Sequence, residues 1–400
     1  MKFIENVEEQ RYKDFYNNFA DNNFMQSYEF GIANKIGRGQ IPCYVGLEDD
    51  NGNLVAVSLL VRRDTPLNMC YFYAPRGFLI DFNNKELLAI FTSEIKAYLK
   101  RNNAIYLKID PEIMYQENDS YANVIENGKN NFDIFNNLIE LGYKHKGFNK
   151  LYDANQPRYT FRIPLDKPLK DIEANASTSF LKTIKRSYFY DLEITETDDI
   201  KTFYELIKLV AEKDGFSEYK FEYYEAIYDE FSKDNNIMIH QCTIYPDKVL
   251  ENINIELEKN KDNNEKLTRL NKDLNFFKPM EGKYPDGLVI ASLVTITTNN
   301  KAWTMYIGNN NIGQYTFAIS RLYYEALLCI HNKKLLYLDL FGVCGDPNTN
   351  YKNLANIYEF KRKFGGELIE FIGEFDLINK PFWYKVLPVL LKIYRKLKRK

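Results

Sequence analysis

The spacing of apolar residues in the first part of the chain predicts a hairpin of two strands, then a helix, then a further strand. Two runs rich in β-branched residues flank the Asp/Asn/Gly cluster 49–53, a pattern typical of a β-hairpin. Between 87 and 100 the apolar residues recur three and four positions apart, which predicts an amphipathic helix. An apolar run from Ile105 to Ile109 predicts a strand that ends at Pro111, because the residue before a proline is pushed towards extended geometry.

The same order of elements returns in the second part of the chain. Apolar runs at 287–297 and 302–307 flank a Thr-Asn-Asn sequence and predict a second hairpin. An amphipathic helix is predicted over 315–332 and a strand over 335–340. Since hairpin, helix and strand occur twice in this order, the sequence predicts an α/β (α+β) protein with two domains of one mixed kind.

The segment 247–275 interrupts this second pattern. It is rich in Glu, Lys and Asn, contains neither glycine nor proline, and has the polar stretch 260–264 at its middle. Apolar residues on each side of that stretch are three and four positions apart: Leu250, Ile253 and Leu257 before it, and Leu267, Leu270 and Leu274 after it. Two narrow apolar seams around a polar turn favour an inserted antiparallel helical hairpin over a single solvated, charged helix.

Composition and charge place the chain among ordinary globular proteins. Of its 400 residues, 45% are hydrophobic and 27% are charged, which excludes a disordered chain. No apolar run approaches the ~20 residues that span a bilayer, and the first ten residues lack the apolar core of a signal peptide, so we expect a cytoplasmic protein. The net charge of −2 requires any polyanionic partner to be met by a local basic patch.

Cysteine and histidine patterns indicate neither metal nor nucleophilic chemistry. The five cysteines and three histidines lack the close spacing of zinc ligands, so we expect no metal site. The chain also lacks a P-loop, a Gly-x-Gly-x-x-Gly turn and a Gly-x-Ser-x-Gly elbow. If the protein is an enzyme, its motifs indicate neither metal, nucleotide nor serine chemistry.

Several short motifs occur in a fixed order over almost the full length of the chain, at 71–77 with Ile80-Asp81, 106–111, 141–148, 306–311, 342–345, 360–365 and 373–381. Their order and spacing, together with the inserted hairpin, resemble the Fem family of peptidoglycan aminoacyltransferases.

The resemblance implies two GNAT-like acyltransferase domains with the helical arm inserted in the second. The expected limits are 1–153 for the first domain, 154–245 with 281–384 for the second, 246–280 for the arm, and 385–400 for a basic C-terminal tail. It also implies transfer of an aminoacyl group from aminoacyl-tRNA to the stem peptide of a peptidoglycan precursor, lipid II or its bridge-extended form. Aminoacyl-tRNA is then a co-substrate, and no cofactor is expected.

The resemblance also suggests site residues. Lys361, in Phe-Lys-x-x-Phe-Gly, matches the family lysine and is our candidate for stabilising the oxyanion formed during aminolysis, with Phe360 beside the acyl donor. The alternative is that Lys361 is an ordinary surface cation like its two basic neighbours. The remaining candidates are substrate-binding residues: Lys35 and Arg38 for the pyrophosphate of the acceptor, Lys220 and Tyr224 on one helix face, and the strand residue Tyr306. Asp339 could orient the amine, although a structural hydrogen bond is the simpler interpretation.

The C-terminal segment 385–400 contains no acidic residue and combines an apolar helical face with many cations. Such a helix can lie on an anionic membrane, so we expect peripheral association with the inner face of the cytoplasmic membrane. A solvated tail or a tRNA contact is the alternative. A homodimer, or a heterodimer with another Fem-type protein, is among the assemblies that the resemblance allows.

Two other functions stay open at this point. One is an acyl-CoA-dependent N-acyltransferase of the GNAT type, which requires a pyrophosphate-binding turn before a helix; Asn309–Asn310–Asn311–Ile312–Gly313 is at best a remnant of one. The other is a non-catalytic scaffold that binds the precursor or a partner protein through the arm.

Overall fold

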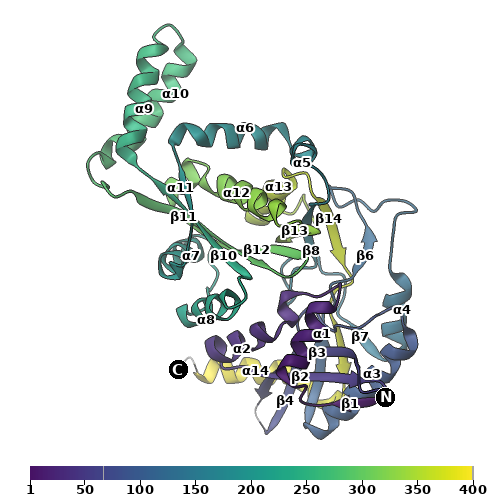
Figure 1. The fold of residues 1–400 in the computed structure, drawn as a ribbon. Coiled ribbons are helices and arrows are strands. Elements are labelled where there is room, and N and C mark those ends of the chain that lie inside the picture. The colour runs from purple at the N-terminus through teal and green to yellow at the C-terminus, as the bar shows by residue number, and fades with distance from the viewer. Residues whose placement is uncertain (66, 399–400) are drawn as a thin grey trace.

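The computed structural model describes residues 1–65 and 67–398, with side chains described as far as residue 389. It contains two mixed sheets, one in the lower part of Figure 1 and one in the upper part, with helices packed around both. The first sheet has the order β1 (Lys2–Ile4), β2 (Ile41–Glu48), β3 (Leu54–Thr65), β4 (Met69–Ala74), β5 (Ala104–Ile109), β15 (Phe375–Ile378) and β7 (Tyr143–His145). Its helices are α1 (Glu9–Asn18), α2 (Tyr28–Arg38), α3 (Lys85–Arg101) and α4 (Phe132–Glu140).

The second sheet is built in the same way with one further edge strand. Its order is β6 (Met114–Glu117), β14 (Glu367–Phe371), β8 (Tyr159–Pro164), β13 (Tyr337–Val343), β12 (Lys301–Asn309), β11 (Leu288–Thr297), β10 (Ile237–Ile244) and β9 (Glu193–Thr197). Its helices are α5 (Leu169–Asn175), α6 (Thr178–Ser187), α7 (Ile200–Asp214), α8 (Phe221–Ser232), α11 (Asn311–Tyr315), α12 (Ala318–Asn332) and α13 (Lys352–Arg362). Both predicted hairpins are confirmed, as β2–β3 and β11–β12.

The two sheets share one succession of strand directions. In each, three antiparallel pairings are followed by a parallel pairing across a helix, β4 with β5 across α3 and β12 with β13 across α12. Two further strands follow on the same side of each parallel pair, and both pair antiparallel with their neighbours. They are β15 and β7 in the first sheet, and β8 and β14 in the second. The duplicated pattern predicted from the sequence is therefore present strand by strand.

Strands from distant parts of the chain tie the halves together. β15, from near the C-terminus, lies between β5 and β7 of the first sheet. β6, from before residue 153, pairs with β14 at the edge of the second sheet. Each sheet thus takes one strand from across the boundary predicted at residue 153.

An apolar core also joins the halves. One buried cluster combines Phe24 and Val57 from the first half with Phe203 and Trp303 from the second. Next to it, α2 packs on α8 so closely that a Cβ at Gly37 would lie 2.4 Å from Cα of Tyr223. The close packing fixes α2, and the basic residues at its end, relative to the second sheet.

Helix α12 starts later than the periodicity predicts. The predicted helix 315–332 begins at Ala318, because Phe317 has a left-handed backbone with φ of 64° that separates α11 from α12. An apolar periodicity continues through such a residue and does not reveal it.

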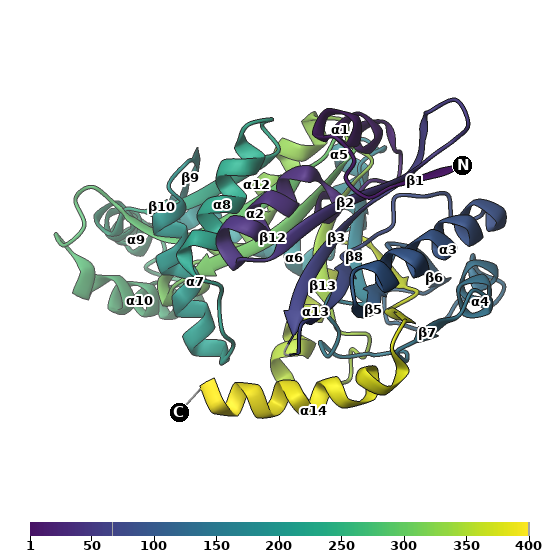
Figure 2. The same cartoon turned by 90° about the horizontal axis from the view of Figure 1, so that it is seen from below.

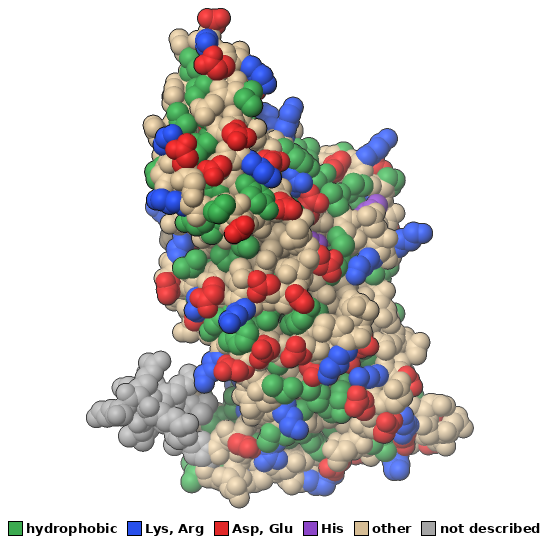
Figure 3. All heavy atoms as spheres, turned by 60° about the vertical axis from the view of Figure 1, so that its left-hand side comes forward, with side chains coloured by type: hydrophobic (Ala, Val, Ile, Leu, Met, Phe, Trp, Pro, Cys, Tyr) green, Lys and Arg blue, Asp and Glu red, His purple; other side chains and the backbone are tan. Residues whose placement is uncertain are grey.

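The predicted arm is confirmed as an antiparallel pair of helices, α9 (Pro246–Lys259) and α10 (Asn264–Phe277), which projects from the top of the molecule in Figure 1. Leu250, Ile253 and Leu270 of the predicted seams are buried. On the face seen in Figure 3, cations and carboxylates alternate along the arm, and pairs such as Lys259–Glu256 and Lys261–Glu258 neutralise one another.

The base of the arm is held by a buried carboxylate. Asp273 accepts hydrogen bonds from the hydroxyls of Tyr315 at 2.7 Å and Tyr190 at 3.3 Å. The ring of Tyr315 also stacks on Phe276, with centroids 3.8 Å apart. These contacts attach the arm to α11 and hence to the second sheet.

Replacing Tyr315 with phenylalanine should therefore lower the free energy of unfolding by about 1–3 kcal/mol, because a buried carboxylate loses its shorter hydrogen bond while the ring stack remains. Chemical unfolding followed by circular dichroism measures the loss. Tyr351→Phe, at an exposed tyrosine, is the matched control and should change stability little. Equal stability of the two variants would contradict the anchoring role of Asp273.

Most of the segment predicted as a basic tail belongs to helix α14 (Pro381–Lys398). Figure 2 shows this helix as a rod along one side of the molecule. Trp383, Tyr384 and Leu387 pack beside Met69 and Ile105 of the first sheet. The side chains from residue 390 onward, which carry most of the predicted basic surface, lie outside the described residues.

Candidate functional site

A cleft opens where two parallel strands of the second sheet separate. β12 and β13 pair at Lys301 with Tyr337, Ala302 with Leu338, and Trp303 with Asp339. Beyond these pairs β12 stays with β11 and β13 stays with β8, so the two strands diverge. The space between them and the helices α7, α12 and α13 is a cleft of about 850 Å³.

The first sheet has no equivalent opening among its described strands. There, β4 and β5 remain paired to their ends, at Tyr73 with Lys108 and Ala74 with Ile109. The duplicated fold therefore provides one separated strand pair, in the second half, and the candidate site is built on it.

Lys361 lines this cleft from the last turn of α13. Its side chain is 9% exposed, and its ammonium donates hydrogen bonds to the carbonyls of Phe341 and Gly342, both at 3.0 Å. Burial lowers the pKa of Lys361 to about 8, although the negative charge of Asp339 acts in the opposite direction. A partly desolvated cation at the wall of a cleft can stabilise a developing oxyanion more strongly than an exposed one.

Aromatic side chains form much of the remaining wall. Tyr224 and Tyr306 meet edge to face with centroids 5.2 Å apart, and the hydroxyl of Tyr306 lies 3.2 Å from that of Tyr223. Phe360 also lines the cleft and packs on Tyr323 at 5.4 Å. Burial raises the pKa values of Tyr224 and Tyr306, which keeps both hydroxyls neutral.

The structure thus brings four of the predicted site residues, Tyr224, Tyr306, Phe360 and Lys361, into one cleft. Among the described residues, Lys35, Arg38 and Lys220 do not line it. Lys35 is exposed on α2, and Lys220 is exposed at the residue that precedes α8, so the predicted helix face holds Tyr224 alone. Whether these cations bind substrate remains a prediction.

Arg38 occupies an intermediate position. Its guanidinium carbon lies 4.8 Å from the ring centroid of Tyr219 and 5.7 Å from that of Tyr223. Tyr219 itself lines the cleft. Arg38 therefore reaches from the first half to the rim of the cleft.

Three contributors to the site were not predicted. Tyr219 and Tyr223 belong to an aromatic series with four-residue spacing around the start of α8, a pattern equally typical of a buried helix face. Phe341 lines the cleft and supplies a carbonyl to Lys361. Its role depends on its left-handed backbone, with φ of 60°, which no sequence pattern marks.

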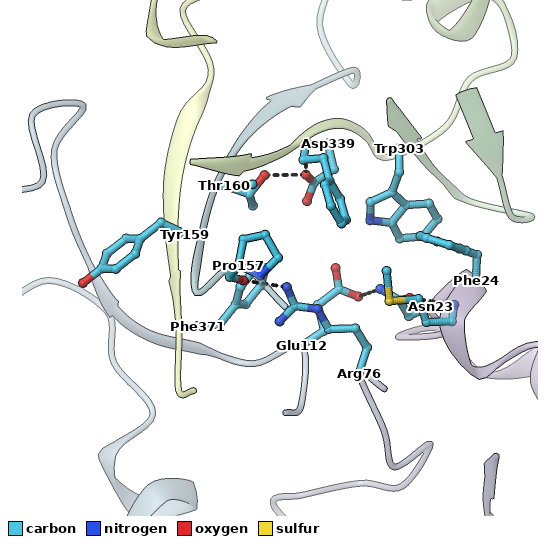
Figure 4. A pocket seen from close by; sticks show the side chains of 13 residues that line it. Asn23, Phe24, Arg76, Glu112, Pro157, Tyr159, Thr160, Trp303, Asp339 and Phe371 are labelled. Atoms are coloured by element: carbon cyan, nitrogen blue, oxygen red, sulfur yellow. Dashed lines mark hydrogen bonds between the residues drawn. The ribbon is translucent and has the colours of Figure 1, made fainter. Parts of the chain in front are cut away.

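Behind the turn at Phe341 lies a second, small cavity between the two halves (Figure 4). Glu112 of the first half accepts hydrogen bonds from Asn23 and Arg162, and Arg162 also donates to Asp339 at 2.9 Å. Burial would raise the pKa of Glu112, but Arg162 and nearby Lys301 hold it below its ordinary value. Glu112 and Asp339 therefore line the cavity, and their shared ion pairs with Arg162 join the two halves behind the candidate site.

Within the part of the chain that the structure describes, no group of three or more His, Cys, Asp or Glu residues is arranged to hold a metal ion. The arrangement offers three features: an aromatic cleft, an ammonium at its wall, and Arg38 at its rim. These features suit attack by an amine on an activated acyl group, which needs no covalent protein intermediate.

Comparisons with known proteins find relatives over most of the chain. A sequence model described as the FemAB family matches residues 7–271 and 248–392. The lipid II:glycine glycyltransferase of Staphylococcus epidermidis is 28% identical over 386 residues, covering 88% of this chain and 89% of that protein. The protein of the same name from Staphylococcus aureus is 27% identical over 374 residues, covering 84% and 85%.

Solved structures confirm the predicted fold of two GNAT-like units. The crystal structure of FemX aligns with a TM-score of 0.78 at 22% identity, covering 96% of this chain and 100% of FemX. A tandem GNAT protein from the clavulanic acid biosynthesis pathway aligns with a TM-score of 0.50 at 8% identity, covering 94% of this chain and 98% of that one.

Proposed function

The chain belongs to the FemAB family, and on this basis we propose that it builds the cross-bridge of peptidoglycan. It takes an aminoacyl group from aminoacyl-tRNA and transfers it to an amine on the stem peptide of lipid II, or of a bridge-extended form. The names of the relatives, lipid II:glycine glycyltransferases, support the acceptor. The observation that carries the proposal is the cleft at the diverging strands with the buried ammonium of Lys361 at its wall.

The chemistry is aminolysis of an ester. The neutral acceptor amine attacks the ester carbonyl, a C–N bond forms, and the ester C–O bond breaks. The amine loses one proton, and the departing ribose hydroxyl of the tRNA gains one, so the reaction needs no cofactor. Lys361, as an ammonium, stabilises the oxyanion of the tetrahedral intermediate. Phe360 and the tyrosine wall exclude water, which would otherwise hydrolyse the ester.

The acceptor carries a pyrophosphate, for which the end of α2 is suited. Lys35 and Arg38 lie one turn apart near the end of that helix, and Arg38 is at the rim of the cleft. A guanidinium can bind two phosphate oxygens at once. We propose that this pair binds the pyrophosphate while the stem peptide enters the cleft, and that Lys220 contributes to the same role.

We also propose that the protein works at the inner face of the cytoplasmic membrane, where a lipid-linked acceptor is found. Among the described helices, none is long and apolar enough to cross a bilayer. On α14, Phe382 is 68% and Val389 58% exposed, on the side away from the residues that pack on the first sheet. Exposed apolar residues within a cationic segment suit an anionic membrane surface.

Transfer from acyl-CoA is less well supported. In α11 the backbone N–H groups of Ile312 and Gly313 donate to the side chain of Asn310, each at 3.0 Å. These are the donors that a pyrophosphate would use at the start of that helix. In the structure Asn310 accepts from both of these donors, which weighs against pyrophosphate binding at this turn.

The proposal is tested by offering the purified protein labelled aminoacyl-tRNA with lipid II in detergent or vesicles, using glycine, alanine and serine in turn. Parallel reactions contain the soluble UDP-linked precursor as acceptor or acetyl-CoA as donor. We expect a new amide on the stem peptide only with aminoacyl-tRNA. Acetylation, or tight lipid II binding without any transfer, would instead favour the acyl-CoA enzyme or the scaffold.

The pKa of Lys361 predicts how transfer depends on pH. The single-turnover rate should rise as the acceptor amine loses its proton and fall above about pH 8 as Lys361 loses its own. Spontaneous hydrolysis of the ester is subtracted by a reaction without protein at each pH. A rate that keeps rising well above pH 9 would show that the protonated form of Lys361 is not needed.

A further inference from the structure

The ammonium of Lys361 is held by an irregular turn of β13 rather than by a carboxylate. Its two acceptors are the carbonyls of Phe341 and Gly342. The pairing of β13 with β8 is irregular between Asp339 and Gly342, and Phe341 has a left-handed backbone. A bulky residue rarely adopts that conformation unless the surrounding structure imposes it.

The carboxylate of Asp339 is hydrogen-bonded to this turn. Asp339, 2% exposed, accepts a hydrogen bond at 2.7 Å from the backbone N–H of Phe341, two residues further on. The same carboxylate accepts from the hydroxyl of Thr160 and from Nε of Arg162, both on the neighbouring strand β8. Figure 4 shows the bond between Thr160 and Asp339. One carboxylate thus joins two strands and the turn that carries the carbonyls.

We propose that Asp339 is a positioning residue for the reaction: its carboxylate, held by Thr160 and Arg162, fixes the turn at Phe341 and thereby sets the position and charge of the Lys361 ammonium in the cleft. The inference rests on the proposed function of Lys361. Asp339 lines the small cavity behind the turn and is not among the residues that line the cleft, so it acts through Lys361 and does not touch the substrate.

Among the described residues, Asp339 is the charged group that shifts the pKa of Lys361, and it raises it. Tyr152 donates to the carbonyl of Gly342 at 2.6 Å, and Tyr323 lines the cleft. Burial raises the pKa values of both tyrosines and of Tyr306, so they stay neutral over the range of an assay. On α13 itself, Glu359 is paired with Arg362. Removing the charge of Asp339 should therefore lower the pKa of Lys361 further.

The decisive variant is Asp339→Asn, read by two measurements. In protein labelled with ¹³C at the ε-carbon of lysine, the Lys361 resonance is assigned as the one missing from Lys361→Met, and its pH titration is followed. We expect the midpoint to move to lower pH in Asp339→Asn. In the transfer assay we expect kcat to fall by about 10- to 100-fold, because Lys361 is misplaced, with the acceptor KM nearly unchanged. The alkaline limb of the pH profile should move with the titration.

The double variant separates positioning from a general loss of structure. If Asp339 acts through Lys361, then adding Asp339→Asn to Lys361→Met should slow transfer no further. The effects of two residues that work as one unit are not additive. Full additivity, or an unchanged Lys361 titration, would overturn the inference. The titration needs no turnover, so a protein that transfers nothing would refute the proposed function while the titration still decides the role of Asp339.

Asp110 provides a matched control. It is also 2% exposed, lies next to the end of the equivalent strand β5, and accepts from the hydroxyl of Tyr73 and the backbone N–H of Arg76, each at 2.7 Å. Asp110→Asn should destabilise the protein similarly and leave the Lys361 titration in place. If Asp339→Asn does not fold, Thr160→Val removes one donor to the same carboxylate at constant charge. It should lower kcat by about threefold or more, and an unchanged kcat would overturn the inference.

Discussion

Replacing Lys361 with methionine is expected to slow single-turnover transfer by about 10²- to 10³-fold, the usual effect of removing one group that stabilises an oxyanion. Acceptor binding should change little, because the cations proposed for the pyrophosphate lie elsewhere, on α2. The alkaline limb near pH 8 should disappear in this variant. Lys363→Met, two residues further along the chain, is the matched control and should transfer at nearly the normal rate.

The same substitution should not destabilise the protein, which separates it from a folding defect. Burial lowers the pKa of Lys361 from 10.5 to about 8, so the fold disfavours its charged form. That difference corresponds to at most about 3 kcal/mol, offset in part by the hydrogen bonds that the carbonyls of Phe341 and Gly342 lose. We therefore expect Lys361→Met to be as stable as the original protein at pH 7, or more stable.

The pH dependence of stability gives a further check. The unfolded chain keeps the lysine proton up to about pH 10.5, whereas the folded chain releases it near pH 8. Between these values the unfolded state binds more protons, so the stability of the original protein rises with pH relative to Lys361→Met. Urea unfolding at pH 7 and pH 9 measures this change. A variant that is markedly less stable at both values, or that transfers normally, would contradict the assigned role.

Replacing Arg162 with leucine is expected to lower the free energy of unfolding by about 3–5 kcal/mol, because it leaves Glu112 and Asp339 buried without their shared partner. The guanidinium also lies 4.3 Å from the ring centroid of Tyr337, so packing is lost as well. Thermal and chemical unfolding measure the loss. Since Arg162 joins both halves, we expect them to unfold less cooperatively in this variant.

Two further variants make this prediction specific. Arg62→Leu breaks a more exposed pair with Asp64 and should cost about 0–1 kcal/mol. Adding Glu112→Gln to Arg162→Leu removes one of the two unpaired buried carboxylate charges. The double variant should therefore be more stable than Arg162→Leu alone. An Arg162 variant no less stable than the Arg62 variant would show that the buried network does not hold the halves together.

The sequence was sufficient to predict the elements that depend on local pattern. The two hairpins, the helical arm and the repeated order of elements follow from spacing, and Tyr306, Phe360 and Lys361 lie within ordered motifs. The partner of a strand is not local, however. Residues 375–378 are expected in the second domain, yet they pair with β5 and β7 of the first sheet, a long-range pairing that local sequence pattern does not reveal.

The contacts that hold Lys361 in place could not be predicted from the sequence either. Asp339 and Thr160 meet because β13 pairs with β8 across 179 positions of the chain. The turn at Phe341 follows from that pairing, so neither motif nor periodicity reveals it. The four-residue spacing of Lys220 and Tyr224 suggested one helix face, but α8 begins at Phe221, and Lys220 precedes it. Spacing identifies a face only where the helix already exists.

The central claim is that this chain transfers an aminoacyl group from tRNA to a peptidoglycan precursor with Lys361 at the reacting carbonyl. The most direct measurement is a single-turnover reaction of the protein with labelled aminoacyl-tRNA and lipid II, with the product analysed by mass spectrometry for an amide on the stem peptide. The account predicts that the amide forms with the original protein and with Lys363→Met, and forms at least about 100-fold more slowly with Lys361→Met. No amide with glycine, alanine or serine, or equal rates with and without Lys361, would contradict it.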